Sequence, residues 1–288
     1  MDLLIRDIRY AVRRLLRAPG FTTTAVLSLG LGIGANTAIF SIVDSVLLRD
    51  MPARSPEELV ELFTSERNGY EYATFSFPDY RYVREQATSF QDVAARYAAM
   101  LSIANDDGTS DILWGEVVTA NLFDVLGVDA HVGRALHGAD DEDSSALAVI
   151  SQGLWIRRFG GDSTVVGQTV RLNGQPVMIA GVMPADFTGQ FPGFQMDIWV
   201  PMGMAVPLHL ADEGYTEARG ERNLFPVARL LPGVTAERAG AELRTLAEHL
   251  ARDYPETNEG HTFSLLPSDE VSFNPVVDRA LVPVAVLL

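Results

Sequence analysis

Hydrophobic and polar positions divide this chain into an apolar window near the start, a long patterned body and a short apolar end. The window from Ala18 to Val43 is 26 residues long and contains no charged residue. Because about 20 apolar residues span the hydrocarbon core of a bilayer, this window predicts a membrane helix over residues 19–48. Apolar and basic positions alternate at helical spacing before it, which predicts an amphipathic helix over residues 1–18.

Arginines mark the N-terminal side of this window. The basic face of the predicted amphipathic helix consists of Arg6, Arg9, Arg13 and Arg17. Such a helix lies in the headgroup plane of a membrane, with an ordinary solvated helix as the alternative. Because short cytoplasmic flanks keep their arginines, we expect the N-terminus in the cytoplasm and the body outside. A cleaved signal peptide is disfavoured, since its apolar region would be only about 7–15 residues long.

Small residues are dense within the predicted membrane helix. Gly30 and Gly34 form a G-x-x-x-G pair, and Ala38 follows one turn later. This spacing lets helix backbones approach closely in lipid, so we expect these residues to pack against other membrane helices. A single inert anchor is the alternative. The apolar run over 280–288 predicts the start of a truncated second membrane helix, and thus a fragment of a longer protein.

The body alternates between strand-like and helix-like patterns. Helices are expected to begin after the capping residues Ser76, Ser151 and Thr235, and a short helix to end at Gly127. The Asn173-Gly174 dipeptide is the strongest hairpin signal in the chain. Strands are expected over residues 58–64, 93–103, 114–119, 146–150, 168–172, 177–183, 198–200, 223–230 and 262–266.

Two β-α-β blocks frame a mostly β block, which predicts an α+β fold. The outer blocks together have the composition of a ferredoxin-like, porter-type unit. We therefore expect an α/β sandwich that carries an inserted, mostly β subdomain. The predicted divisions are 1–18 for the cytoplasmic helix, 19–48 for the first membrane helix, 49–110 and 221–275 for the two porter-like halves, 111–220 for the insertion and 280–288 for the second membrane helix.

The N-terminal segment and the body of the chain differ in net charge as clearly as they differ in hydropathy. Residues 1–20 carry a net charge of +3, whereas residues 50–279 carry 16 arginines against 35 acidic residues, a net charge of −19. Such an acidic body repels phosphate backbones, so nucleic acid is not an expected partner. The chain has no cysteine, which excludes disulfides and thiol chemistry, and all 22 of its basic residues are arginine.

No catalytic or metal-binding motif stands out. The five histidines form no H-E-x-x-H pair, and no G-x-S-x-G sequence is present. A Walker A loop needs a lysine, so this stretch cannot itself carry a standard ATP-hydrolysing domain. The acidic cluster from Asp140 to Asp143 lacks the spacing of a calcium loop and is expected to be a solvated loop. We therefore expect no enzyme, and neither a metal nor a cofactor within this chain.

Aromatic side chains gather in two loop segments. Phe191 and Phe194 lie in the glycine- and proline-containing loop 189–194, and Tyr70 and Tyr72 lie in the other segment. Aromatic loops are typical of contact surfaces, but the same side chains fill a core equally well, so both interpretations stay open.

Several runs of residues carry a resemblance to a known family. They are Asp7-Ile8-Arg9-Tyr10-Ala11, Leu29 to Ser41 (LGLGIGANTAIFS), Asn121 to Val128 (NLFDVLGV), Leu230 to Thr235 (LLPGVT) and Tyr254 to Asn258 (YPETN). The chain resembles the N-terminal half-unit of MacB/FtsX-type ABC transporter permeases, most closely those of the ADOP type. The matching motifs look structural, so the resemblance carries over no catalytic residue.

The resemblance implies a permease of the bacterial inner membrane with a MacB-like periplasmic core domain. It implies an ATP-binding ABC subunit, fused or separate, whose ATP-driven movement is transmitted mechanically to the periplasmic domain. That domain would act in efflux or handle substrates and partner proteins outside the cytoplasm. Pairing of two permease units as a homodimer in the lipid bilayer is also expected. A membrane-anchored extracytoplasmic binding or scaffold module without an ATPase is the alternative.

Overall fold

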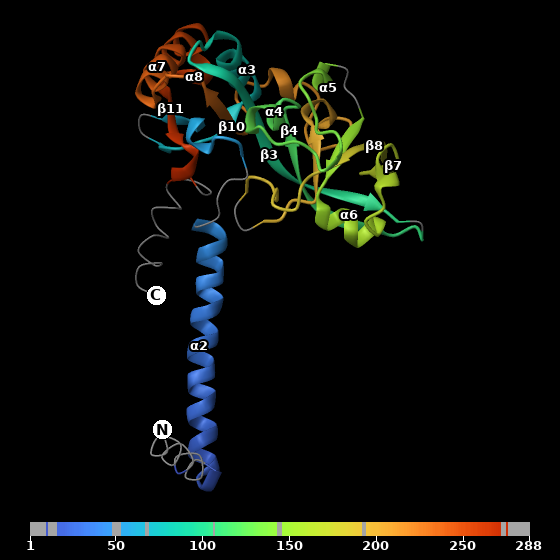
Figure 1. Cartoon of the computed structure of the whole chain (residues 1–288). Helices are drawn as coiled ribbons and strands as arrows, with labels where there is room; N and C mark the ends of the chain where they lie inside the picture. The colour runs from blue at the N-terminus through green and yellow to red at the C-terminus, as the bar shows by residue number, and fades with distance from the viewer. Residues whose placement is uncertain are drawn as a thin grey trace.

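The computed structural model describes residue 10 and residues 16–47, 53–66, 69–105, 107–142, 146–191, 194–271 and 275. They form a long helix, α2, and a body of mixed helices and strands at one end of it (Figure 1). The expected mixture of helices and strands is thus confirmed. The second membrane helix predicted at 280–288 lies outside the described residues.

Helix α2 covers Pro19–Leu47, which matches the predicted helix over 19–48. Proline fits its first position, because the first N–H of a helix has no partner within the helix. The large apolar side chains of Phe21, Leu29 and Leu31 are 67–73% exposed. Among the described residues, no helix reaches the combined length and apolarity that a membrane crossing requires, so the predicted crossing is not confirmed.

Four antiparallel strands form the first half of the body, and two helices cover one face of them. In spatial order the strands are β11 (His261–Pro267), β1 (Leu59–Glu66), β10 (Arg222–Leu230) and β3 (Phe90–Ala104). The helices are α3 (Phe77–Gln86) and α7 (Ala236–Asp253), followed by the short α8 (Pro255–Asn258). A two-residue strand, β2 (Phe75–Ser76), pairs with β10.

Strand β3 is 15 residues long and continues past β10 into the second half of the body. From β3 the sheet runs through β4 (Ser110–Val118), β9 (Ile198–Pro201), β6 (Leu147–Ile150) and β8 (Gln175–Val182) to β7 (Thr169–Leu172). Because β7 pairs with β3 again, at Ile103 and Leu172, the sheet closes into a barrel-like ring. The edge strand β5 (Val132–Gly133) pairs with β8.

Short helical elements complete the body. The α-helical ones are α4 (Leu122–Leu126), α5 (Ala139–Glu142) and α6 (Gln152–Phe159). The 3-10 turns are η1 (Pro56–Glu58), η2 (Ser163–Val165), η3 (Met202–Met204), η4 (Tyr215–Glu217) and η5 (Ser268–Glu270).

The sheet does not divide as cleanly as the sequence pattern indicates. Residues 90–96 of β3 pair with β10, whereas residues 96–104 pair with β4. One strand therefore serves both halves, and the barrel-like sheet is not clearly ferredoxin-like. Strand pairing depends on partners far away in the sequence, so the alternation within β3 could not show this sharing. The predicted domain boundaries stay a prediction.

The helices begin and end next to the residues that predicted these boundaries in the sequence. The side-chain oxygens of Ser76, Ser151 and Thr235 each accept the backbone N–H three residues later, at 3.0–3.3 Å. These bonds satisfy donors that the first turn of a helix leaves open. Gly127 ends α4 with a φ of 67°, which glycine adopts without steric cost. All four predicted helix boundaries are confirmed.

The predicted hairpin at Asn173-Gly174 is also confirmed, with φ values of 46° and 84°. The side chain of Asn173 accepts the backbone N–H of Ser102 at 2.7 Å and donates to the carbonyl of Leu208 at 2.7 Å. The turn therefore does more than reverse the chain, because its asparagine ties β7 to β3 where the ring closes.

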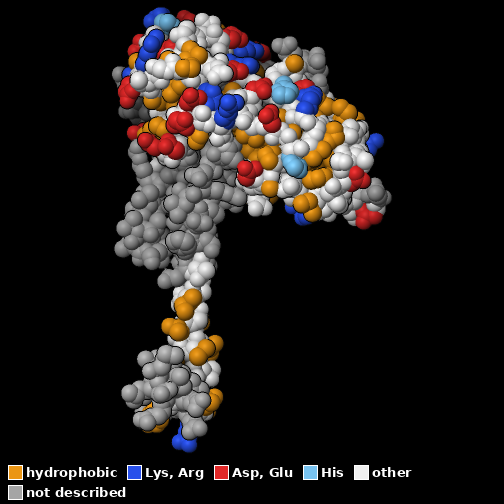
Figure 2. All heavy atoms as spheres, in the orientation of Figure 1, with side chains coloured by type: hydrophobic (Ala, Val, Ile, Leu, Met, Phe, Trp, Pro, Cys, Tyr) orange, Lys and Arg blue, Asp and Glu red, His pale blue; other side chains and the backbone are white. Residues whose placement is uncertain are grey.

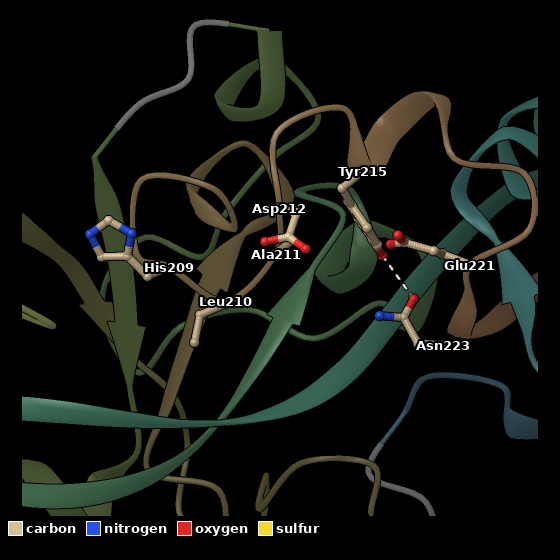
Figure 3. A pocket seen from close by; sticks show the side chains of 7 residues that line it. All are labelled: His209, Leu210, Ala211, Asp212, Tyr215, Glu221 and Asn223. Carbon is tan, nitrogen blue, oxygen red and sulfur yellow. Dashed lines mark hydrogen bonds between the residues drawn. The ribbon is translucent and has the colours of Figure 1, made fainter.

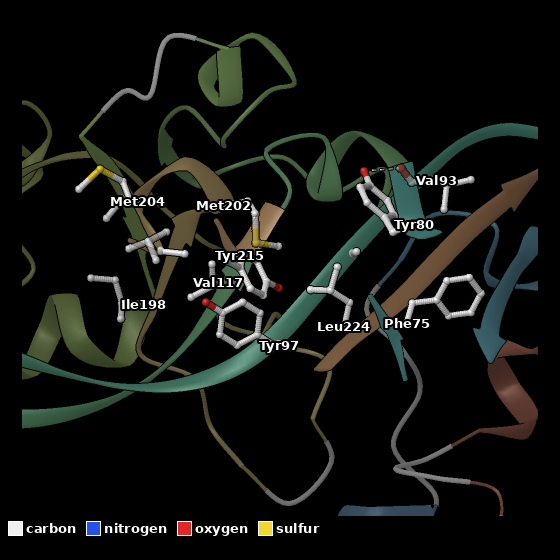
Figure 4. Packing of buried hydrophobic residues seen from close by; sticks show 14 of the residues in the cluster. Phe75, Tyr80, Val93, Tyr97, Val117, Ile198, Met202, Met204, Tyr215 and Leu224 are labelled. Carbon is white, nitrogen blue, oxygen red and sulfur yellow. Dashed lines mark hydrogen bonds between the residues drawn. The ribbon is translucent and has the colours of Figure 1, made fainter. Parts of the chain in front are cut away.

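Two hydrophobic clusters lie on opposite faces of the sheet. In β9, Ile198 and Val200 join one cluster and Trp199 joins the other, as the alternation of a strand requires. Figure 4 shows Tyr97 and Tyr215 packed within the first cluster, which fills the inside of the ring. The barrel-like half is therefore a packed core and not a pore.

A buried ionic cluster holds α3 against the end of β10 and α8. The carboxylate of Asp79 is fully buried and accepts hydrogen bonds from Arg222 at 2.8 Å, from Asn258 at 3.1 Å and from Arg219. The guanidinium of Arg219 also stacks 3.9 Å from the ring centre of Tyr254. The run from Tyr254 to Asn258 therefore has a structural role, as expected from its position among the matching motifs.

We expect Asp79→Asn to lower the free energy of unfolding by about 3–5 kcal/mol, because it removes the buried carboxylate from two guanidiniums that are only 13% and 15% exposed. Urea unfolding of the chain in detergent measures this loss. Glu217→Gln is the matched control, since it breaks an exposed ion pair with Arg81 and should cost about 1 kcal/mol or less. Equal losses in the two variants would contradict a central role of Asp79.

Candidate functional site

The structure describes part of the site that the sequence predicts. Gly30 and Gly34 lie on α2 with open space where a side chain would stand, and Arg17 is exposed just before the helix. Helix packing and a cytoplasmic basic face therefore stay predictions. Outside the described residues lie the side chain of Ala38 and the arginines Arg6, Arg9 and Arg13.

The acidic cluster at 140–143 does not begin as a solvated loop, so that expectation is wrong for Asp140 and Asp141. Two N–H groups of Arg134 donate to Asp140, at 2.7 and 2.8 Å, and they hold the pKa of this carboxyl below its ordinary value. Asp141 accepts the backbone N–H of Ala120 at 2.7 Å. Within the described part of the chain, no group of three or more histidines and acids is arranged to hold a metal ion.

A charged triad is buried in the middle of the sheet. It consists of Glu61 on β1, Arg96 on β3 and Glu116 on β4, which are 4%, 5% and 0% exposed. Arg96 donates to the carboxylate of Glu61 at 3.0 Å and to the carbonyl of Phe225 at 3.3 Å. Burial raises the pKa of both carboxyls, while the Arg96 charge opposes this shift. Glu61 contacts Arg96 directly, whereas Glu116 is affected by the Arg96 charge without a hydrogen bond to it. One guanidinium near two buried carboxyls thus favours uptake of a proton by one of them.

The triad also fixes the loop between β8 and β9. Glu116 accepts the backbone N–H of Gln190 at 3.0 Å and the indole N–H of Trp199. Gly189 has a φ of 91°, and a Cβ there would come 2.5 Å from Cγ of Met196. Only glycine therefore lets the loop approach the sheet so closely. A buried carboxyl group therefore ties this loop to the sheet, together with the backbone bond from Asp197 to the carbonyl of Trp114 at 2.7 Å.

This loop forms one wall of an apolar groove of about 410 Å³. The rings of Trp114 and Phe194 are each 43% exposed, with their centres 5.1 Å apart. Met100 lies directly across from Trp114 on β3, and with Ile112 it extends the exposed apolar surface. Figure 2 shows hydrophobic side chains gathered over the barrel-like half. The groove is lined by Tyr97, Ala98, Trp114, Phe191, Phe194, Met196, Asn223 and Phe225.

The aromatic segments divide between the two interpretations that the sequence left open. Phe191 is buried over the guanidinium of Arg96, which lies 5.8 Å from the ring centre, whereas Phe194 is exposed. Tyr70 is 79% exposed. Sequence reasoning singled out both loop phenylalanines but missed Trp114 and Phe225, because the strands that carry them meet the loop only in the folded chain. An exposed apolar groove of this kind favours an apolar ligand or partner.

A polar hollow of about 340 Å³ lies beside the groove, and Asn223 lines both. Figure 3 shows Asp212 and Glu221 on different sides of Tyr215, with His209 farther away. The Tyr215 hydroxyl donates to Oδ1 of Asn223 at 3.0 Å, and burial raises the pKa of this tyrosine. The residues that line the hollow include no serine, threonine or cysteine nucleophile.

Comparisons with known proteins agree with this architecture. The family model described as MacB-like periplasmic core domain matches residues 22–246. The chain is similar to the periplasmic region of MacB from Actinobacillus actinomycetemcomitans, at 14% identity and a TM-score of 0.54, covering 85% of this chain and 97% of that one. It is also similar to the extracellular domain of the noncanonic ABC-type transporter YknZ from Gram-positive bacteria, at 18% identity and a TM-score of 0.52, covering 71% and 98%. At these identities, the two structures show a shared fold only. No curated protein sequence matches.

We expect the stability of the body to fall as the pH rises above the ordinary glutamate pKa of 4.5, because the triad carboxyls bind protons more tightly when folded than when unfolded. Glu116→Gln removes one of these two contributions. The decrease in unfolding free energy between about pH 5 and pH 8 should therefore be smaller in this variant, as urea unfolding at each pH measures.

Asp140, whose pKa is lowered, has the opposite sign, and its contribution is lost only as the pH falls below its ordinary value of 3.8. The titration of Asp140 therefore does not contribute to the change in stability between about pH 5 and pH 8. Glu217→Gln reports the effect of losing one exposed acid. A pH dependence of Glu116→Gln identical to that of the parent chain would rule out a titrating triad.

We expect the groove to bind a small neutral apolar probe, such as N-phenyl-1-naphthylamine, whose fluorescence rises in apolar surroundings. Trp114→Ala should weaken this binding about tenfold, which corresponds to about 1.4 kcal/mol of lost aromatic contact. Ile156→Ala is the control, since Ile156 is an exposed apolar side chain on α6 that does not line the groove. Equal affinity of the Trp114→Ala variant and the parent chain would refute binding at the groove.

Proposed function

The chain belongs to the family of MacB-like periplasmic core domains, and we propose that it is the extracytoplasmic part, with its membrane anchor, of an ABC-type permease. The observation that carries this proposal is the extent of the family match, which runs from within α2 through most of the body. The family match therefore includes most of α2 as well as most of the body.

Helix α2 serves as the anchor in this proposal. Its 29 residues correspond to a length of about 43 Å, and its large apolar side chains are exposed to the surroundings. The helix is preceded by the arginine-rich segment, so the N-terminus faces the cytoplasm and the body lies outside the inner membrane. Gly30 and Gly34 then give close contact with further membrane helices or with a second copy of the permease.

The energy for the proposed permease comes from a partner. Because the chain has no lysine for a Walker A loop, ATP would bind a separate or fused ABC subunit in the cytoplasm. Movement of that subunit would pass through the membrane helices to the body by mechanotransmission. The apolar groove is the surface on which the body would handle a substrate or partner outside the cytoplasm, with efflux as the outcome.

An anchored binding module without an ATPase is the second candidate. The exposed rings of Trp114 and Phe194 favour it, because a groove that binds an apolar ligand needs no ATP to do so. The two candidates share the anchor and the groove and differ in the cytoplasmic partner.

We expect the complete gene product, purified from its native membranes, to bring with it a stoichiometric ATP-binding subunit. Mass spectrometry of the purified complex identifies this subunit, and a known transporter complex purified in parallel controls for dissociation. If the control complex stays intact and no ATPase accompanies the protein, the permease proposal fails and the binding module replaces it.

A further inference from the structure

Residues 54–58 bring the chain into the body, and the side chain of Arg229 on β10 binds them there at three points. This guanidinium is 8% exposed. Its Nε donates to the carbonyl of Val125 at 2.9 Å, and one terminal nitrogen donates to the carbonyl of Arg54 at 2.6 Å. The other terminal nitrogen donates to the carbonyl of Ser55 at 3.3 Å and to the carboxylate of Glu58 at 2.9 Å.

The same segment closes the end of α4. Carbonyls in the last turn of a helix lack partners within the helix, and here Arg229 satisfies that of Val125. The backbone N–H of Arg54 donates to the carbonyl of Leu126 at 2.8 Å. A Cβ on Gly127 would come 2.7 Å from Cβ of Arg54, so the incoming chain lies directly against the helix end. The C-terminal end of the NLFDVLGV run is therefore the surface that the incoming segment contacts.

The outgoing chain reaches the same place. Strand β11 pairs with β1, with Pro267 opposite Val60, and η5 follows it. The turn η5 lies against η1 and against β1, and Ser268 is buried there. The segments by which the chain enters the body and leaves β11 thus share one contact region.

We propose that Arg229 is a mechanical joint that fastens residues 54–58 to β10 and α4, so that a displacement that arrives at residue 54 from the proposed membrane anchor is passed on to the sheet. Arginine suits this task because its planar fork donates in several fixed directions, here to two separate segments. A segment held only by its own covalent bonds would absorb a displacement by rotation about φ and ψ. The mechanical consequence rests on the proposed function, whereas the fastening itself does not.

Hydrogen exchange of the full chain in lipid nanodiscs tests the fastening. The backbone N–H groups of Arg54 and Glu58 are hydrogen-bonded, so these two amides should give the peptide over residues 53–58 slowly exchanging positions in the parent chain. In Arg229→Gln, exchange in this segment should be about tenfold faster, with no change in α7. Arg244→Gln is the matched control, because it removes an exposed arginine of α7 and should leave exchange at 53–58 unchanged.

Two results would overturn the joint. The first is that residues 53–58 of the parent chain exchange as fast as an unstructured peptide. This result would refute the fastening even if the Arg229→Gln variant does not fold. The other is unchanged exchange in a folded Arg229→Gln variant. Once an ATPase partner is identified, this variant should keep that partner bound but lose ATP-driven transport. Absence of a partner would refute the permease and leave the exchange result standing.

Discussion

Arg96 is a charge buried at the centre of a sheet, and its neighbours are arranged to neutralise it. A buried guanidinium without partners is strongly unfavourable, so β1 contributes the carboxylate of Glu61 and β10 the carbonyl of Phe225, while Glu116 of β4 adds a nearby negative charge without a hydrogen bond. This requirement places Glu61 and Glu116 on the same face as Arg96 and constrains how the strands pair. Glu116 then accepts the backbone of the loop at Gln190, and that loop builds a wall of the groove. The exposed apolar surface therefore depends on a buried carboxyl group.

Strand β10 connects the features that the proposed function needs. Arg229 lies near its C-terminal end, the carbonyl of Phe225 faces Arg96, and Asn223 lines the groove. Six residues of extended strand separate Arg229 from Asn223, a distance of about 20 Å. Because β10 is paired with β1 on one side and β3 on the other, it moves with its neighbours rather than alone. A displacement at the joint would therefore shift the triad and the groove together.

Features decided by residues close in sequence could be predicted, whereas features assembled from distant segments could not. Ser151 starts α6 and Asn173-Gly174 turns the hairpin because the necessary hydrogen bonds and φ values are local. The groove escaped prediction because its walls come from β3, β4, β10 and a loop. The sequence did contain one indication of the triad. Glu61 is an acidic residue within an apolar strand, and a carboxylate buried there needs a charged or hydrogen-bonding partner. The identity of that partner, Arg96, depends on strand pairing that no local spacing reveals.

In the proposed permease, a coupling between the groove and α2 must act in both directions. If displacement of the sheet changes the affinity of the groove by some factor, then a ligand in the groove changes the equilibrium of that displacement by the same factor. A typical coupling of about 1–3 kcal/mol corresponds to a factor of about 5–150. A ligand shifts an equilibrium only between states that it binds with different affinity. Coupling therefore requires that a displacement of α2 also changes the groove. If residues 54–58 were loosely attached to the body, α2 could move without changing the groove, and the coupling free energy would approach zero. In the proposed permease, the burial of Arg229 among three carbonyls would therefore keep residues 54–58 coupled to the sheet that carries the groove.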